Sequence, residues 1–331
     1  MTTFSDQFRS DFNLGIEAFF GLPLVGDILW RDNAGNDVVW LMNNNTPSSM
    51  AALPFVTPDW HFKAAAEFDL VTGMIQGSAD ILWQNDNGAL ALWQMDDMTL
   101  NTVRALPNPG PAWHVVTDND FNGDKADDIF LQNDNGSLAL WTITSASMAT
   151  ISGMFAGTQN PGPSWHVVGS GDTSGDQKGG ILWQNNNGAL ALWENPTFGA
   201  STFTFITVAA LPTVDASWHV KGMADVNFDG TSDVVFQNDS GAVVVWEMGG
   251  TAGTTITSAN LINLNPGPAW HIVGLRDMNG DEKADILFQN DNGAAAEWVG
   301  YQSLGSGMAT FNTVLAITPN PNPNGHVWDL L

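Results

Sequence analysis

The hydrophobic positions of the chain form short runs, and each run is bounded by polar residues that favour turns. Segments such as HVV, DILW and GALALW are rich in β-branched, aromatic and other apolar residues, which is typical of strands. Between them lie QNDNG segments, whose Asn-Gly pair tolerates positive φ and marks a tight hairpin. No stretch has a helical period of useful length. The pattern therefore predicts an all-β protein.

The strands recur about every 52 residues, in three coincident registers. The six histidines, spaced by 53, 52, 53, 52 and 55 residues, are His61, His114, His166, His219, His271 and His326. DILW or a variant begins at Asp27, Asp80, Asp128, Gly180, Asp233 and Asp285. The QNDNG turn begins at Gln84, Gln132, Gln184, Gln237 and Gln289, and has become RDNAG at Arg31. Repeats of this size are typical of solenoids and propellers.

Each repeat has room for four short strands. Four-stranded units that pack face to face on their neighbours are the blades of a β-propeller. Residues 1–331 are thus predicted to form one domain, a six-bladed β-propeller. The first repeat lacks a WHVV strand, whereas the last repeat is followed by HVWDLL. We therefore expect the C-terminal strand to complete the first blade, which removes two exposed sheet edges.

The net charge of the chain limits the classes of binding partner that can be expected. It has 35 Asp and Glu against 9 Lys and Arg, and a formal net charge of −26. Nucleic acids and anionic membranes are disfavoured because they are polyanions, and cations are favoured. No apolar run is long enough for a transmembrane helix, so membrane insertion is not expected. Cysteine is absent, which excludes disulfides and thiolate metal sites.

Oxygen-bearing side chains recur at positions 1, 3, 5 and 9 of the loop between the first two strands of three repeats. They are Asp120, Asn122, Asp124 and Asp128; Asp225, Asn227, Asp229 and Asp233; and Asp277, Asn279, Asp281 and Asp285. Alternate positions of a tight loop point inward, and Ca²⁺ prefers clustered oxygen ligands. The sequence predicts Ca²⁺ as the cofactor of these loops. The alternative is a solvated turn, in which Asp and Asn serve only local hydrogen bonds.

The other three loops depart from this pattern. The fourth loop, DTSGDQKGG, keeps Asp172, Ser174 and Asp176 but has Gly180 at position 9, so only weak binding is expected there. The first two loops, residues 11–27 and 67–80, are longer and carry apolar substitutions. No ion is assigned to them.

The motif D-x-N-x-D-x-x-x-D, followed by two apolar residues, resembles the FG-GAP/VCBS-type repeat. The resemblance covers nearly the whole chain from about Asp11. It implies an integrin-α-like propeller, similar to calcium-containing propeller lectins, with structural Ca²⁺ held by the twelve loop residues named above. The lectins of the family have seven blades, whereas this chain has six repeats, so no sugar site is carried over. We also expect an extracellular or cell-surface location, although the N-terminal segment has no obvious signal peptide.

The Trp-His pairs and the QNDNG turns are expected at the end of the blades opposite the acidic loops. An indole beside amides and carboxylates suits a sugar, because the ring covers C–H groups while the polar groups bind hydroxyls. The predicted glycan-binding residues are Trp113, His114, Trp165, His166, Trp218, His219, Trp270 and His271, with Asn133, Asn185, Asn238 and Asn290 in the turns. Alternatively, the tryptophans fill the wedge between blades, the histidines bond neighbouring carbonyls, and the turns are bare hairpins.

A second tryptophan series ends the third strand of each repeat and is predicted to lie in the core: Trp40, Trp93, Trp141, Trp193, Trp246 and Trp298. Catalysis is not expected. The histidines are dispersed one per repeat, and the chain has no cysteine and no G-x-S-x-G nucleophile motif. A carboxylate pair for glycoside hydrolysis, assembled from distant blades, stays open.

These patterns predict a calcium-stabilised propeller that binds carbohydrate at several equivalent shallow sites and gains affinity through multivalency. The alternative is a calcium-braced scaffold or adhesion module for protein–protein contact, or a repeat domain of a larger secreted protein. The equivalence of the Trp-His units favours the carbohydrate-binding interpretation.

Overall fold

The chain is all-β throughout the part that the structure describes. The computed structural model describes residues 27–32, 34–66, 68, 79–96, 98–144, 150–320 and 328–330. These residues form 24 strands and no helix, which confirms the all-β prediction. Within the same ranges there is accordingly no helical segment that could cross a membrane.

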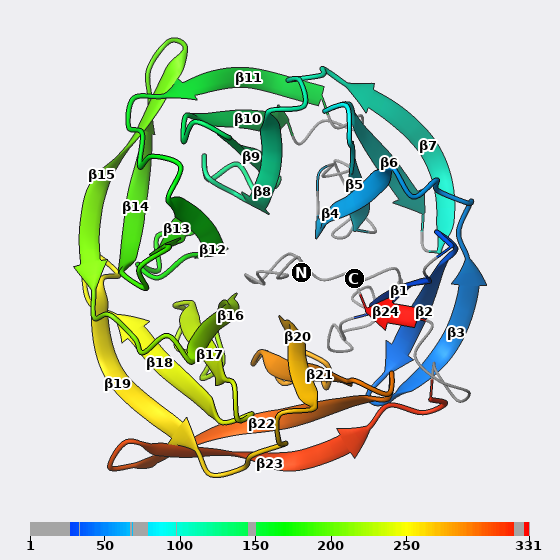
Figure 1. Ribbon diagram of the computed structural model, residues 1–331, viewed down its shortest axis with the longest axis vertical. Helices are drawn as coiled ribbons and strands as arrows, with labels where there is room; N and C mark the ends of the chain where they lie inside the picture. The colour runs from blue at the N-terminus through cyan, green and yellow to red at the C-terminus, as the bar shows by residue number, and fades with distance from the viewer. Residues whose placement is uncertain are drawn as a thin grey trace.

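The strands form six consecutive units of four, arranged in a ring (Figure 1). The first strand of each unit lies nearest the centre of the ring. These first strands are β24 (Trp328–Leu330), β4 (Trp60–Ala66), β8 (Trp113–Asn119), β12 (Trp165–Gly171), β16 (Trp218–Ala224) and β20 (Trp270–Arg276). The second strands are β1 (Ile28–Asp32), β5 (Asp80–Asn85), β9 (Asp128–Asn133), β13 (Gly180–Asn185), β17 (Asp233–Asn238) and β21 (Asp285–Asn290).

The third and fourth strands complete each antiparallel unit. The third strands are β2 (Asp37–Asn43), β6 (Leu90–Asp96), β10 (Leu138–Thr144), β14 (Leu190–Phe198), β18 (Val243–Gly249) and β22 (Ala295–Gly305). The fourth strands form the rim in Figure 1: β3 (Thr46–Ala52), β7 (Thr99–Leu106), β11 (Thr150–Gly157), β15 (Thr202–Leu211), β19 (Thr255–Ile262) and β23 (Met308–Ala316). The second strand β5 is buried along its whole length, whereas the rim strand β3 alternates between exposed and half-buried residues. Second strands are covered on both faces, and rim strands on one.

Six separate four-stranded sheets were expected, but hydrogen bonding merges four of the units into two eight-stranded sheets. The rim strands β11 and β15 pair in parallel at Ala156↔Thr202 and Gly157↔Phe203. The rim strands β19 and β23 do so at Leu261↔Met308 and Ile262↔Ala309. The hairpins β14–β15 and β22–β23 are longer than β2–β3, so their ends reach the neighbouring rim strand. Backbone groups that would otherwise form a free edge gain partners there.

The C-terminal strand pairs with the first repeat, as the sequence predicted. β24 is antiparallel to β1, with Trp30 opposite Leu330 and Asp32 opposite Trp328. The first unit is therefore built from both ends of the described chain, in the order β24-β1-β2-β3.

The core lies between adjacent units. Buried side chains of neighbouring units share clusters, as Leu192 of β14 and Val234 of β17 do. The predicted core tryptophans are 4–9% exposed, which confirms that prediction: Trp40, Trp93, Trp141, Trp193, Trp246 and Trp298. Each faces a residue of its own rim strand, so the rim shields the indole from solvent.

Candidate functional site

The first aspartate of each predicted ion loop folds the loop around its own carboxylate. Asp120 Oδ1 accepts the backbone N–H of Gly123 at 2.6 Å, and Asp120 Oδ2 accepts that of Lys125 at 2.8 Å. Asp225 and Asp277 accept the equivalent bonds from positions four and six of their loops. Positions four and six have a left-handed backbone in all three loops, with φ 81° at both Gly123 and Lys125. This conformation turns their N–H groups toward the carboxylate.

The asparagine at position three brings the remaining polar groups of the loop together. Asn122 Nδ2 donates to Asp124 Oδ2 at 3.2 Å and to Asp128 Oδ1 at 3.4 Å. In the fifth and sixth repeats, Asn227 Nδ2 and Asn279 Nδ2 bond the aspartate at position five at 3.2 Å and 3.3 Å. The amide therefore supplies partial positive charge between carboxylates that would otherwise repel each other.

The aspartate at position nine is completely buried beneath each loop. Asp128, Asp233 and Asp285 are 0% exposed. Each accepts an N–H from its third strand at 2.9–3.1 Å and another from position two of the loop at 3.0–3.2 Å. Burial, reinforced by neighbouring carboxylates, raises the pKa of Asp285 to about 8 and raises the pKa of Asp128 and Asp233 well above the usual value. An ionised carboxylate at this depth needs a positive partner.

The residues of these loops fit a hard cation in kind and in spacing. Each loop has three aspartates and one asparagine at positions one, five, nine and three, and a carboxylate has about four lone-pair sites, more than the backbone N–H groups occupy. As the side chains stand, no group of three or more His, Cys, Asp and Glu in the described ranges is arranged to hold a metal ion. Most of the loops 11–27 and 67–80, to which no ion was assigned, lie outside the described residues, as does His326.

Backbone hydrogen bonds link the acidic loops of successive units. The carbonyl of Asp120 accepts the N–H of Gly179 at 2.8 Å, and the carbonyl of Asp172 accepts that of Ser232 at 2.7 Å. The carbonyl of Asp225 accepts the N–H of Ala284 at 2.8 Å. This contact, in which position one of each loop bonds position eight of the next, was not predicted from the sequence.

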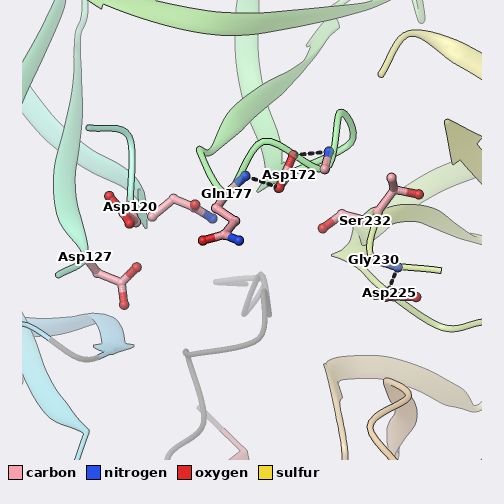
Figure 2. Close-up of a pocket in the computed structure, with 10 residues that line it drawn as sticks. Asp120, Asp127, Asp172, Gln177, Asp225, Gly230 and Ser232 are labelled. Carbon is pink, nitrogen blue, oxygen red and sulfur yellow. Dashed lines mark hydrogen bonds between the residues drawn. The ribbon is translucent and has the colours of Figure 1, made fainter. Parts of the chain in front are cut away.

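A cavity of about 360 Å³ lies where the third, fourth and fifth acidic loops face one another (Figure 2). Three of its lining residues are the first aspartates of these loops, Asp120, Asp172 and Asp225. The other residues are Asn119, Asp127, Gly175, Gln177, Gly230, Thr231 and Ser232. The lining residues include four aspartates and no basic side chain, so the cavity suits a cation or water better than an anion.

The Trp-His pairs and the QNDNG turns lie at the same end of their units, as predicted. Trp113 is opposite Asn133 in the pairing of β8 with β9, and the same register holds for Trp165, Trp218 and Trp270. We call this end of the units the turn face. Because strands alternate in direction, the acidic loops lie at the other end.

Each described histidine of the turn face bonds the third residue of the adjacent turn. His61 Nε2 lies 2.7 Å from Asp86 Oδ1, and His114, His219 and His271 make the same contact at 2.7–2.8 Å. Their partners are Asp134, Asp239 and Asp291, and His166 bonds Asn186 at 2.8 Å. The side chains of these four aspartates are 68–70% exposed to solvent. Sequence reasoning missed these partners, although four of them follow their histidine by 20 residues.

The side-chain amides of the QNDNG turns form hydrogen bonds between neighbouring units and within the turns. Gln84 bonds the carbonyl of Trp113 at 2.7 Å and the N–H of Val115 at 3.0 Å, which ties one unit to the next. Gln132 and Gln237 bond the next tryptophan carbonyl in the same way. The predicted ligand residues Asn133, Asn185, Asn238 and Asn290 each accept the N–H two residues ahead through Oδ1. These oxygens shape the turn.

The tryptophans of the turn face are half-buried. Trp113, Trp165, Trp218 and Trp270 each pack against a buried cluster. Part of each indole therefore serves packing and part stays accessible. The histidines are exposed or nearly so, and they are the more accessible half of each predicted pair.

The model of the FG-GAP-like repeat matches residues 225–288, which run from the first aspartate of the fifth loop into β21. This segment is therefore similar to an FG-GAP-like repeat. The match spans two of the three predicted ion loops and confirms the resemblance drawn from their spacing. No curated protein matches the chain.

Solved structures of similar shape are distant from this chain in sequence. One is a chain of the crystal structure of the mitotic checkpoint complex, with 11% identity and a TM-score of 0.45, covering 88% of this chain and 77% of that one. Another is a chain of the crystal structure of BBS1N in complex with ARL6DN, soaked with mercury, with 13% identity and a TM-score of 0.41, covering 81% and 74%. Likeness at this level carries no conclusion about function.

Proposed function

We propose that residues 1–331 form one six-bladed, calcium-stabilised β-propeller that binds glycans at repeated sites on its turn face, outside the cell or on its surface. The observation that carries this proposal is the equivalence of five units, in each of which a half-buried tryptophan precedes an exposed histidine paired with Asp or Asn at 2.7–2.8 Å. A sugar bound there would meet an indole edge, an imidazole and a carboxylate or amide. The protein would act by binding rather than by catalysis.

The ion loops support the stabilising role of Ca²⁺. The loops that begin at Asp120, Asp225 and Asp277 belong to a series in which backbone hydrogen bonds join each loop to the next. A cation in each loop would neutralise carboxylates that crowd one another and would hold the connection between the first two strands. In this proposal the ion braces the propeller and does not contact the glycan, which lies at the opposite end of the blades.

Asp229→Ala should remove one Ca²⁺ and leave the others in place. The side chain at position five is a ligand in the proposed site, and the loss of one site corresponds to roughly 2.7 kcal/mol of stability at a hundredfold excess of Ca²⁺ over Kd. Calorimetric titration and native mass spectrometry give the number of bound ions. Asp239→Ala, which removes a carboxylate from the turn face, is the matched control and should bind the wild-type number. A wild-type protein that binds no Ca²⁺ would show that the loops are only turns.

Trp165→Ala should weaken glycan binding severalfold and leave some binding, because one of several equivalent sites is lost. The measurement is a glycan array with and without EDTA, followed by titration of the best glycan. Val208→Ala, a rim position 54% exposed, is the control and should bind as wild type. His166→Ala removes an exposed side chain of the same site and separates binding from packing. If Trp165→Ala unfolds the protein and His166→Ala binds normally, the tryptophans are wedges between blades.

Protein contact is the second candidate function, and the rim favours it. Several rim side chains are apolar and 47–68% exposed: Met50, Val103, Met154, Ile206, Val208 and Val314. Apolar side chains at the rim would serve protein contact where they form a contiguous patch, which is what marks an interaction surface. A glycan array without any hit, together with intact Ca²⁺ binding, would favour this scaffold function over the glycan-binding one.

A further inference from the structure

The fourth acidic loop has the conformation of the three predicted ion loops, although its ninth residue is glycine. Asp172 Oδ1 accepts the N–H of Gly175 at 2.7 Å, and Asp172 Oδ2 accepts that of Gln177 at 2.6 Å. These are the bonds that Asp120 makes in the third loop. Asp176 Oδ1 accepts the N–H of Lys178 at 3.1 Å, as the aspartate at position five does elsewhere. Ser174 stands in place of the asparagine at position three, and the carboxylate at position nine is missing.

A glutamate from the neighbouring strand fills the place of the missing side chain. A Cβ atom at Gly180 would lie 1.9 Å from Glu194 Oε1 and 2.2 Å from Glu194 Cδ. The register of β13 and β14, with Ile181 opposite Trp193, brings Glu194 beside Gly180. The carboxylate of Glu194 thus occupies the volume in which the other loops hold the side chain of their position-nine aspartate.

The fifth repeat shows that this placement is specific to the loop without aspartate. Glu247 occupies the same position after the core tryptophan of its strand, but its loop has Asp233 at position nine. Glu247 Oε1 turns instead to Asn260 Nδ2 at 3.0 Å and to the hydroxyl of Tyr301 at 2.8 Å. A glutamate at this position is therefore drawn to the loop only where glycine leaves the space free.

Glu194 is buried and only half satisfied. Its side chain is 0% exposed, and Oε1 accepts the hydroxyl of Thr173 at 2.6 Å. Within the described chain, Oε2 has no hydrogen-bond partner. Burial, with Asp172 and Asp176 nearby, raises the pKa of Glu194 to about 8. A buried carboxylate oxygen without a partner is costly, and a cation in the loop would remove that cost.

We propose that Glu194 supplies the ninth-position carboxylate from β14 and makes the fourth loop a full Ca²⁺ site, together with Asp172, Ser174 and Asp176. The inference rests on the proposed calcium binding of the other loops and extends it to a loop for which the sequence predicted only weak binding. The ligand set has three carboxylates and one hydroxyl, so its negative charge equals that of the three-aspartate ligand sets of the other loops.

The test counts Ca²⁺ ions in full-length variants by native mass spectrometry and calorimetry. We expect four tightly bound ions in the wild type, three in Glu194→Gln and two in Glu194→Gln/Asp229→Ala. Glutamine keeps an oxygen for Thr173, so the fold should survive, and circular dichroism verifies it. Glu247→Gln is the matched control and should keep four ions.

A rescue variant tests whether Glu194 is a Ca²⁺ ligand or a residue with a structural role alone. Gly180 has no positive φ, so Asp is sterically possible there once Glu194 is shortened. Gly180→Asp/Glu194→Ala should bind four ions, whereas Glu194→Ala alone should bind three. Three ions in the wild type and in Glu194→Gln would overturn the role of Glu194 and leave the calcium proposal standing. No ions in any variant would overturn both.

Discussion

EDTA should lower the melting temperature of the protein by roughly 10 °C at physiological ionic strength. Each occupied loop stabilises the folded state by roughly 2.7 kcal/mol when Ca²⁺ is at a hundredfold excess over Kd. The three loops with aspartate at position nine alone give about 8 kcal/mol, and the unfolding entropy of a chain of this length converts that into a shift of roughly 10 °C. Differential scanning calorimetry with Ca²⁺ and with EDTA measures the shift.

The structure gives a physical reason for the sign of this effect. Without a cation, each loop holds its three aspartates close together among backbone and amide N–H groups, and the aspartate at position nine is completely buried. Restoring Ca²⁺ should restore the melting temperature. The variant Asp124→Ala/Asp229→Ala/Asp281→Ala is the control, and its melting curve should respond far less to EDTA. An unchanged wild-type curve would contradict the proposed sites.

Glu297→Leu should stabilise the protein by roughly 3 kcal/mol at pH 8 and by much less at pH 4. Glu297 lies in β22 with 0% exposure, and among the described residues neither carboxylate oxygen has a hydrogen-bond partner. Burial raises the pKa of Glu297 from 4.5 to about 7. At ~1.4 kcal/mol for each pH unit, this difference corresponds to roughly 3 kcal/mol lost on ionisation. The equivalent position holds Leu92, Leu140 and Leu192 in other repeats, so leucine fits the site.

The pH dependence distinguishes this explanation from simple packing. Below pH 4.5 the carboxyl is protonated in both the folded and the unfolded state, so charge makes no difference. As pH rises toward 7, the unfolded chain releases its proton first, and the wild type loses stability relative to Glu297→Leu. Above 7 the full difference is present. Chemical denaturation of both proteins at pH 4, 6 and 8 measures it, and Glu297→Gln should remove the pH dependence without adding apolar packing. A destabilised Glu297→Leu at pH 8 would contradict the prediction.

Much of the architecture could be predicted because the same pattern of strands and turns recurs in each repeat. Trp193 and its five equivalents each follow a turn glycine at a constant spacing, and all of them are buried inside a third strand. The pairing of β24 with β1 followed from a missing strand at one end and a surplus strand at the other. These features depend on strand period and turn chemistry, which a single sequence records.

The features that could not be predicted depend on contacts between strands. The parallel pairing of β11 with β15 depends on how far a long hairpin extends, and nothing in Ala156 or Thr202 specifies it. In the fourth loop, Gly180 stands in place of the aspartate at position nine, and Glu194 lies beside it. This proximity can be recognised only when the register of β13 and β14 is known. By contrast, the bond between His114 and Asp134 has a constant spacing of 20 residues in four repeats, and that signal was present in the sequence.

The closing strand pair has a mechanical consequence. Trp30 is opposite Leu330 and Asp32 is opposite Trp328, so the chain enters β1 and leaves β24 at the same end of the pair. A force applied through both flanking segments loads the hydrogen bonds one after another instead of all together, and strands loaded in this way separate at low force. A tether at one end of the chain alone does not load this seam. The direction of pulling, more than the number of strands, therefore sets how much tension the ring withstands before it opens.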